Sequence, residues 1–368
     1  MNGKKTLLLQ IFLFIATFLT TTIFGFELVN GKFCIDTEGN ITAWGDEWIR
    51  ALQYSISFLG ILTVHEFGHY FTARYYQIRS SLPYYIPFVF IGTMGAFIRM
   101  KEQSRTNKEM FDIGVAGPLA GFIAALGVIV YGFVTLPPPE YIFSIHPEYL
   151  KYGLDYPNYV YNNKIGLYFS GDNLLFSFFR YFISDPARIP VAYELMHYPF
   201  LLSGFLACFF TSLNLLPVGQ LDGGHVTYGL FGERKHNIIA KYIYVIFVFY
   251  VGLGLVTPTV FVTNFNFGII LYAGLLFLMF SKLTTDFKTN LTITLAVFIG
   301  QFATSYFYPG VEGFNSLFLF AFILGRVIGI NHPPALVEEP LDLKRKVIGI
   351  IALIVFIISF SPKPFIVD

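Results

Sequence analysis

Long apolar stretches, each bounded by charged residues or proline, recur along the whole chain. A helix needs about 20 predominantly apolar residues to cross roughly 30 Å of hydrocarbon. We expect membrane spans at 6–26, 49–73, 112–135, 197–218, 242–262, 267–281, 290–308, 314–330 and 346–361. Two of these stretches are short, and the pair around Asn264 is also compatible with one bent hairpin, so eight or nine transmembrane helices are predicted.

Composition and charge agree with a chain that resides in lipid. Of the 368 residues, 55% are hydrophobic and 13% are charged, whereas a soluble protein carries about 25% charged residues. The 24 basic and 23 acidic side chains almost cancel, so there is no basic surplus that would favour nucleic acid. We predict an all-α polytopic membrane protein that interacts with the lipid bilayer and binds no nucleic acid.

The distribution of lysine and arginine predicts the orientation. If the N-terminal lysines stay in the cytoplasm, alternate crossing places 74–111, 231–241, 282–289 and 331–346 on the same side. Most of the lysines and arginines lie in these segments, as the positive-inside rule requires. The long loop 137–196, rich in Tyr, Asn, Asp and Phe, is then expected to form an extracytoplasmic cap.

The same pattern divides the chain into three expected parts. Residues 1–48 form an N-terminal anchor helix and an outside loop, 49–230 form a core with 137–196 as its insertion, and 231–368 hold the C-terminal transmembrane helices. Within the core, 82–100 is interrupted by two prolines and two glycines and is therefore too broken for a helix.

The second span contains the motif His65-Glu66-Phe67-Gly68-His69. Residues four apart on a helix share a face, so both imidazoles can hold one cation while Glu66 reaches a metal-bound water. Ionisable side chains inside a span are costly, and one divalent ion satisfies both histidines together. The motif predicts a zinc site with His65 and His69 as ligands.

A catalytic zinc generally takes three protein ligands, and the third must come from another segment. Glu102 and Glu109 are candidates, but they lie in a Lys/Arg-rich stretch that indicates a solvated loop. The run NLLPVGQLDGGH at 214–225 places Asp222 among glycines that follow a proline. Because irregular backbone at membrane depth needs surrounding protein or a water-filled cavity, Asp222 is the third ligand that we favour.

The two motifs together resemble the site-2 proteases, which are intramembrane zinc metalloproteases. The likeness covers about 48–230 and includes GVAGPLAG at 114–121. The run at 214–225 and the tail at 332–346 are similar to the PDZ-less branch with chloroplast members and bacterial homologues. No loop here has room for the PDZ domain that many family members carry. The segment 82–100 resembles the family's re-entrant β-loop.

The resemblance implies a set of roles. His65, His69 and Asp222 would bind Zn²⁺, Glu66 would act as general base, and Asn214 would lie close to the scissile carbonyl. The implied activity is that of a zinc metalloendopeptidase in regulated intramembrane proteolysis, in which zinc-activated water cleaves transmembrane segments of single-span membrane proteins. We expect a multi-pass protein of a bacterial inner (cell) membrane.

Other readings remain open at this point. A membrane transporter also places carboxylates and broken helices in the bilayer, often with inverted repeats, and none is found in this sequence. A membrane metalloprotease that clips soluble or lipidated peptides commonly uses a downstream glutamate as third ligand. A non-catalytic membrane scaffold is disfavoured by the intact motif.

The sequence leaves open the roles of His197, His225 and His332, the substrate, any prior cleavage and the oligomeric state. His146 and His236 are expected in solvated loops.

Overall fold

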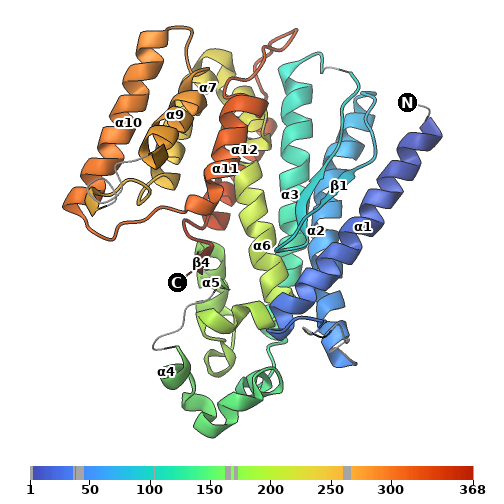
Figure 1. Ribbon diagram of the computed structural model, residues 1–368. Coiled ribbons are helices and arrows are strands. Elements are labelled where there is room, and N and C mark those ends of the chain that lie inside the picture. The colour runs from blue at the N-terminus through green and yellow to red at the C-terminus, as the bar shows by residue number, and fades with distance from the viewer. Residues whose placement is uncertain are drawn as a thin grey trace. The chain divides into compact units, whose positions relative to one another are not determined.

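The computed structural model describes residues 3–35, 38, 45–102, 104–161, 167–169, 173–259 and 267–367. These residues are mostly helical and include two small antiparallel sheets of two strands each (Figure 1). The chain forms two compact units. The first comprises 1–104, 115–214 and 350–368, and the second comprises 105–114 and 215–349. The expected helical class is confirmed, with short strands added.

The elements of the first unit are, in chain order, α1 (Gly3–Asn30), α2 (Asp46–Tyr75), β1 (Tyr84–Pro87), β2 (Thr93–Phe97), most of α3 (Asn107–Val134), η1 (Pro139–Ser144), η2 (Pro147–Asp155), α4 (Pro157–Val160), β3 (Leu167–Phe169), α5 (Leu174–Phe182), η3 (Pro186–Arg188), η4 (Ala192–His197), α6 (Pro199–Asn214) and β4 (Phe365–Val367). The elements of the second unit are α7 (Asp222–Val251), α9 (Phe267–Phe280), α10 (Phe287–Phe307), η5 (Asn315–Leu317), α11 (Phe318–Ile323) and the π-helical η6 (Leu324–Ile328). Helix α12 (Leu343–Ser359) contributes to both units.

An aromatic core holds the long helices of the first unit together. Phe58 of α2, Ile129 of α3 and Phe205 of α6 are fully buried in one cluster. Gly204 of α6 lies directly against Ile129, so that a Cβ atom there would overlap the isoleucine side chain. Small residues at such contacts let helix backbones approach closely in a membrane protein.

The segment that the sequence marked as too broken for a helix forms a β-hairpin. Strands β1 and β2 pair antiparallel, with Tyr84 opposite Phe97. The tip of the hairpin is fastened to the helices, since the hydroxyl of Thr20 in α1 donates to the Gly92 carbonyl at 2.7 Å and that of Tyr54 in α2 donates to the Ile91 carbonyl at 3.0 Å. The loop between β1 and β2 therefore anchors the hairpin to both α1 and α2.

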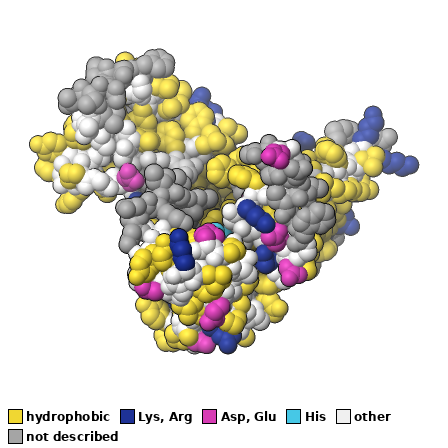
Figure 2. All heavy atoms as spheres, turned by 60° about the horizontal axis from the view of Figure 1, so that its bottom comes forward, with side chains coloured by type: hydrophobic (Ala, Val, Ile, Leu, Met, Phe, Trp, Pro, Cys, Tyr) yellow, Lys and Arg dark blue, Asp and Glu magenta, His cyan; other side chains and the backbone are white. Residues whose placement is uncertain are grey.

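The expected cap consists of short 3₁₀ and α-helices from η1 to η4, together with β3. It lies at the end of the first unit opposite the N-terminus of α1 (Figure 1). Strand β3 pairs antiparallel with β4, which comes from the C-terminal end of the chain, and Phe169 lies opposite Phe365. Figure 2 brings this end forward and shows acidic and basic side chains scattered among hydrophobic ones, without a field of one sign.

The second unit is organised around α7, which corrects one expectation. His236 was expected in a solvated loop, but its segment 231–241 is helical except at Gly232, whose φ of 76° puts a kink in α7. Good helix formers in this segment account for the difference, because charge alone does not end a helix. Elsewhere in this unit, Arg345 binds the Asp112 carboxylate at 2.7 Å and Asn107 binds the backbone of Glu339.

Two of the helices in the described ranges are long and apolar enough to cross a membrane by length and composition, Lys4–Asn30 and Asn107–Val134. Three shorter apolar helices occupy Pro199–Asn214, Gly268–Phe280 and Asn315–Ile328. Helix α6 ends at Asn214, earlier than the expected span 197–218. The count of eight or nine spans stays a prediction.

Candidate metal centre

Helix α2 places His65 and His69 one turn apart on the same face. Their Nε2 atoms lie 3.1 Å from each other, and the ring centroids are 4.9 Å apart with the planes at 70°. Both side chains are buried, with exposed fractions of 5% and 8%. The helical spacing that the sequence displayed therefore produces a close pair of imidazoles that faces protein and not solvent.

The distance between the two nitrogens fits a metal. Zinc binds imidazole nitrogen at about 2.0–2.1 Å with tetrahedral geometry, so two ligand atoms on one zinc are separated by roughly 3.3 Å. The 3.1 Å between the Nε2 atoms of His65 and His69 is close to that edge length. The chemistry of the donors also fits, because neutral imidazole is among the ligands that zinc prefers.

Glycines of the neighbouring helix make the room for this pair. A Cβ atom at Gly121 of α3 would lie 2.9 Å from the Cβ of His65, and one at Gly117 would overlap the His69 ring. Gly68, inside the motif on α2, is similarly close to α3: a Cβ atom there would lie 2.7 Å from the Ala116 carbonyl oxygen. Gly117 and Gly121 belong to the run GVAGPLAG quoted above for its family resemblance, and their spacing of four residues places both on one helix face, where small residues allow close packing.

Glu66 and Asn214 complete what the first unit contributes. Glu66 follows His65 directly on α2 and is 6% exposed. Asn214 is the last residue of α6, and its Nδ2 atom lies 3.5 Å from the Nε2 of His65, at the long end for a hydrogen bond. The first unit thus gathers two imidazoles, one carboxyl group and one carboxamide.

Asp222 is the first residue of α7, in the second unit, and is half-buried. The backbone before it is irregular, as expected, because 215–221 lies outside any helix. The segment folds back tightly onto the first turn of α7, since a Cβ atom at Gly223 would overlap the Leu215 carbonyl. Asp222 itself begins a helix, which the glycines around it did not indicate.

Three histidines of the second unit form a separate polar group. The Nε2 atom of His332 lies 2.8 Å from the Nδ1 of His225, and its own Nδ1 lies 2.6 Å from the Pro333 carbonyl. His236 is fully buried, and its Nδ1 is 2.8 Å from the Thr227 hydroxyl. The expectation of a solvated His236 is wrong, because 231–241 is helical and packed.

The segment that carries these motifs matches a known protein family. Residues 53–257, more than half of the chain, match Peptidase family M50. The chain belongs to the M50 peptidase family. The stretch that matches the M50 profile contains the α2 histidines, the α3 glycines, Asn214 and Asp222, so the resemblance to site-2 proteases is confirmed at the level of the family.

The M50 chain is also similar to curated plant proteins. It is 30% identical over 189 residues to the "Probable zinc metalloprotease EGY1, chloroplastic" of Oryza sativa subsp. japonica, which is 50% of this chain and 28% of that protein. The protein of the same name from Arabidopsis thaliana is 28% identical over 190 residues, 50% of this chain and 30% of its own length. The "Probable zinc metalloprotease EGY2, chloroplastic" of Oryza sativa subsp. indica is 26% identical over 187 residues, with 49% and 29% covered. The match spans less than a third of each relative. No solved structure matches.

The two other carboxylates considered as ligands in this M50 chain have structural partners. Glu102 pairs with the exposed Arg79 guanidinium at 2.6 Å. Glu109 accepts a hydrogen bond from the backbone N–H of Arg105 at 2.8 Å, while the Thr106 hydroxyl accepts one from the Glu109 N–H at 3.1 Å. The latter pair is a capping arrangement for α3, so both carboxylates are explained without a metal.

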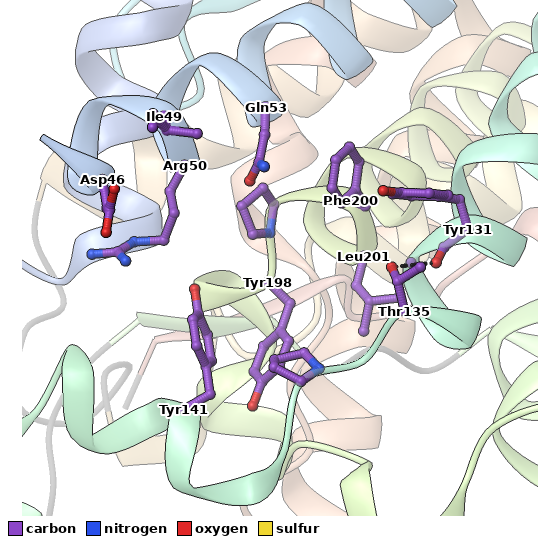
Figure 3. Close-up of a pocket in the computed structure, with 13 residues that line it drawn as sticks. Asp46, Ile49, Arg50, Gln53, Tyr131, Thr135, Tyr141, Tyr198, Phe200 and Leu201 are labelled. Carbon is purple, nitrogen blue, oxygen red and sulfur yellow. Dashed lines mark hydrogen bonds between the residues drawn. The ribbon is translucent and has the colours of Figure 1, made fainter.

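A cavity of about 340 Å³ lies elsewhere in the first unit of the M50 chain. It is lined by side chains from the start of α2, the end of α3, η1 and the segment that leads into α6, among them Arg50, Tyr131, Tyr141 and Tyr198 (Figure 3). None of its lining residues belongs to the motif on α2. This cavity is therefore not part of the candidate metal centre.

Proposed function

We propose that the chain is an intramembrane zinc endopeptidase that cleaves transmembrane segments of single-span membrane proteins. The observation that carries the proposal is the buried pair of α2 imidazoles, with Nε2 atoms 3.1 Å apart, in a chain of the M50 peptidase family. Family membership supplies the class of reaction, and the geometry of the pair supplies a place for the ion that this reaction requires.

His65, His69 and Asp222 would hold the zinc ion in this proposal. The spacing of the two nitrogens, the glycine-lined room around the rings and the donor chemistry support the first two ligands. Asp222 is supported by its half-buried position directly after an irregular segment. Bound zinc supplies Lewis acidity and lowers the pKa of a coordinated water to about 7.

The chain's own residues would handle the proton. Glu66 accepts the proton of the attacking water and passes it to the nitrogen of the leaving amine as the C–N bond breaks and the new C–O bond forms. Glu66 as a residue is 6% exposed, and this burial limits exchange of that proton with bulk solvent. The Asn214 Nδ2–H group would donate to the oxyanion that develops on the scissile carbonyl.

The hairpin gives the substrate a place to extend. A peptide bond inside a helix is shielded because its N–H and C=O groups are hydrogen-bonded within the helix, so a transmembrane segment must unwind before attack. In the part of the chain that the structure describes, β2 pairs only with β1. We propose that substrate backbone adds to the hairpin edge as a further strand.

We place this activity in a bacterial inner (cell) membrane, with the protein as a multi-pass component. The distribution of lysine and arginine and the two helices long enough to span support a membrane location. The relatives above carry names that describe them as chloroplastic, so a chloroplast membrane is the second setting in which to test the protein.

The deciding experiment compares membrane-protein fragments in cells that produce the wild-type chain, Glu66→Gln or Glu102→Gln. We expect fragments with new termini inside transmembrane segments in the wild type and in Glu102→Gln, and their loss in Glu66→Gln. Glu102 is a matched control because it carries the same group on an exposed ion pair. Terminal-peptide mass spectrometry reads the cut sites, and equal fragments in wild type and Glu66→Gln would refute the proposal.

A further inference from the structure

A second group of metal-ligand side chains lies in the cap, away from the motif on α2. It consists of His146, between η1 and η2, and of Glu194 and His197, in η4. One ligand atom from each residue lies within 4.8 Å of the other two. His146 was expected to be solvated, but it is half-buried here, and the function proposed above does not use this group.

Hydrogen bonds at the Nδ1 atoms of His146 and His197 orient the Nε2 atoms of the two rings toward each other. The Nδ1 of His197 lies 3.0 Å from the Val29 carbonyl, and the Nδ1 of His146 lies 3.0 Å from the Glu148 carboxylate. An acceptor at Nδ1 requires the proton there, which leaves the Nε2 lone pair of a neutral ring free to bind a cation. These two Nε2 atoms are 3.2 Å apart.

The buried carboxyl group of Glu194 faces the same space. It is 1% exposed, and neither of its oxygens accepts a hydrogen bond within the described part of the chain. One oxygen lies 3.3 Å from the His197 Nε2. A cation held between the two rings would give this buried carboxyl group a partner, as buried charged groups require.

We infer that His146, Glu194 and His197 form a second binding site for a divalent metal ion of the zinc type. Two imidazoles and one carboxylate are an established zinc ligand set, and the edges of a tetrahedral zinc site measure roughly 3.3 Å. The two measured edges are 3.2 Å and 3.3 Å. The carbonyl and carboxylate on the outer nitrogens are the supporting contacts that zinc-bound histidines usually make.

The site would fasten the cap to the long helices. His146 belongs to the first part of the cap, Glu194 and His197 to its last part, and the carbonyl that holds His197 belongs to α1. Gly31, directly after α1, lies against both rings, with its ideal Cβ position 3.2 Å from each Cε1 atom. A metal ion there joins two segments of the cap that are distant in sequence, and the His197 bond to Val29 links them to α1, so its role is structural.

The test counts zinc in the purified full-length chain after equilibration with Zn²⁺ and desalting. A His65→Ala/His69→Ala variant removes the site on α2, so any remaining zinc is bound elsewhere. We expect about one equivalent in this background, its loss on adding Glu194→Gln, and no change on adding Glu140→Gln. Glu140 is the matched control because it lies exposed in η1 of the same cap.

This design separates the inference from the proposed peptidase activity, because the background variant has no site on α2. Glu194→Gln preserves side-chain size and removes only the charge, and circular dichroism and size exclusion of each variant report whether it folds. Substitution with Co²⁺ gives a second readout, a visible absorption band of the background variant that Glu194→Gln abolishes. If the three residues are only a hydrogen-bonded group with protonated Glu194, the background variant holds no zinc and shows no band, and the inference is overturned.

Proteolysis adds a readout for the structural role. Removing zinc with a chelator is expected to speed cleavage of the cap by trypsin roughly tenfold in the His65→Ala/His69→Ala background, because a ligand that binds only the folded state stabilises it. The rate in the chain that also carries Glu194→Gln should not respond to the chelator. Equal responses in both chains would contradict a metal that holds the cap.

Discussion

The two close histidine pairs of the first unit have nearly the same geometry but arise in different ways. His65 and His69 bring their Nε2 atoms to 3.1 Å through one helical turn. His146 and His197 reach 3.2 Å through contacts between segments 51 residues apart. The first pair is a property of local structure, whereas the second exists only once the first and last parts of the cap have packed together.

The surroundings of the pairs differ as well. The α2 pair is enclosed by glycines of a neighbouring helix, and a long-range amide from Asn214 approaches it. The cap pair is held from behind by a carbonyl and a carboxylate. In the α2 pair one helix already aligns the ligands, which leaves room for a substrate. In the cap pair both rings are hydrogen-bonded at Nδ1 to other residues, which suits a metal that joins segments.

The largest expected difference between the two sites is in cleavage rate. Glu66→Gln should lower the rate on a single-span test substrate in proteoliposomes by about 10²–10⁴-fold, the usual contribution of a general base, with zinc content unchanged. Glu194→Gln should change this rate by less than about threefold while removing one zinc. An equal loss of rate in both variants would mean that the two sites do not differ in function.

The next largest effect concerns the room around the α2 pair. Gly117→Ala places a methyl group in the position of the His69 ring, so the ring must move. A displacement of about 1 Å can cost about 10²-fold in rate, and we expect a loss of this size together with weaker zinc binding. Gly127→Ala on the same helix meets no atom within 4 Å and should keep full activity. A wild-type rate in Gly117→Ala would show that the glycine is not needed.

A smaller effect is expected at Gly31, the glycine that lies against the histidine pair of the cap. Gly31 has φ of 62° and touches both rings, whereas Gly153 has φ of 56° and nothing within 4 Å. Alanine at either position strains the backbone by about 1–2 kcal/mol, so thermal unfolding should show a similar loss for both. Only Gly31→Ala should also weaken zinc binding in the His65→Ala/His69→Ala background. Equal zinc affinities would show that the ring contacts are unimportant.

The smallest effects come from two tyrosine hydroxyls, one beside each pair. Tyr141 donates to the His197 carbonyl at 3.1 Å, and the hydroxyl of Tyr85 in β1 lies 2.7 Å from that of Thr63 on α2. Phenylalanine at either position should cost about 0.5–1.5 kcal/mol of unfolding free energy. Tyr85→Phe should also lower the cleavage rate, since the hairpin is then held less firmly beside α2, and Tyr141→Phe should not. The reverse ranking of rates would contradict the assignment of the hairpin to the substrate.

What could be predicted from the sequence follows this division between local and distant contacts. The four-residue spacing of His65 and His69 is a local signal, and so are the prolines and glycines that mark the hairpin at 82–100. The cap group gave no such signal, because His146 stands 48 positions before Glu194 and neither sits in a recognisable motif. Its existence depends on how short 3₁₀ helices pack, which no periodicity reveals.

Helix boundaries show the same limit. The charged residues from Glu233 to Lys235 suggested a cytoplasmic loop, yet α7 continues through them, with Gly232 absorbing the change of direction. His236 consequently becomes a buried residue bonded to Thr227. Hydropathy locates the apolar core of a helix but not its ends, since a polar helical extension satisfies its own backbone hydrogen bonds just as an apolar one does.

The pairing of β3 with β4 has a consequence for synthesis. A ribosome delivers the chain from its N-terminus, so residues 167–169 emerge long before Phe365. The central part of the cap therefore cannot close its small sheet, nor bring Phe169 against Phe365 at 5.6 Å, until residues 365–367 have been translated. This part of the cap is completed only after α12 has left the ribosome, and a chain cut short before residue 365 would leave that edge unpaired.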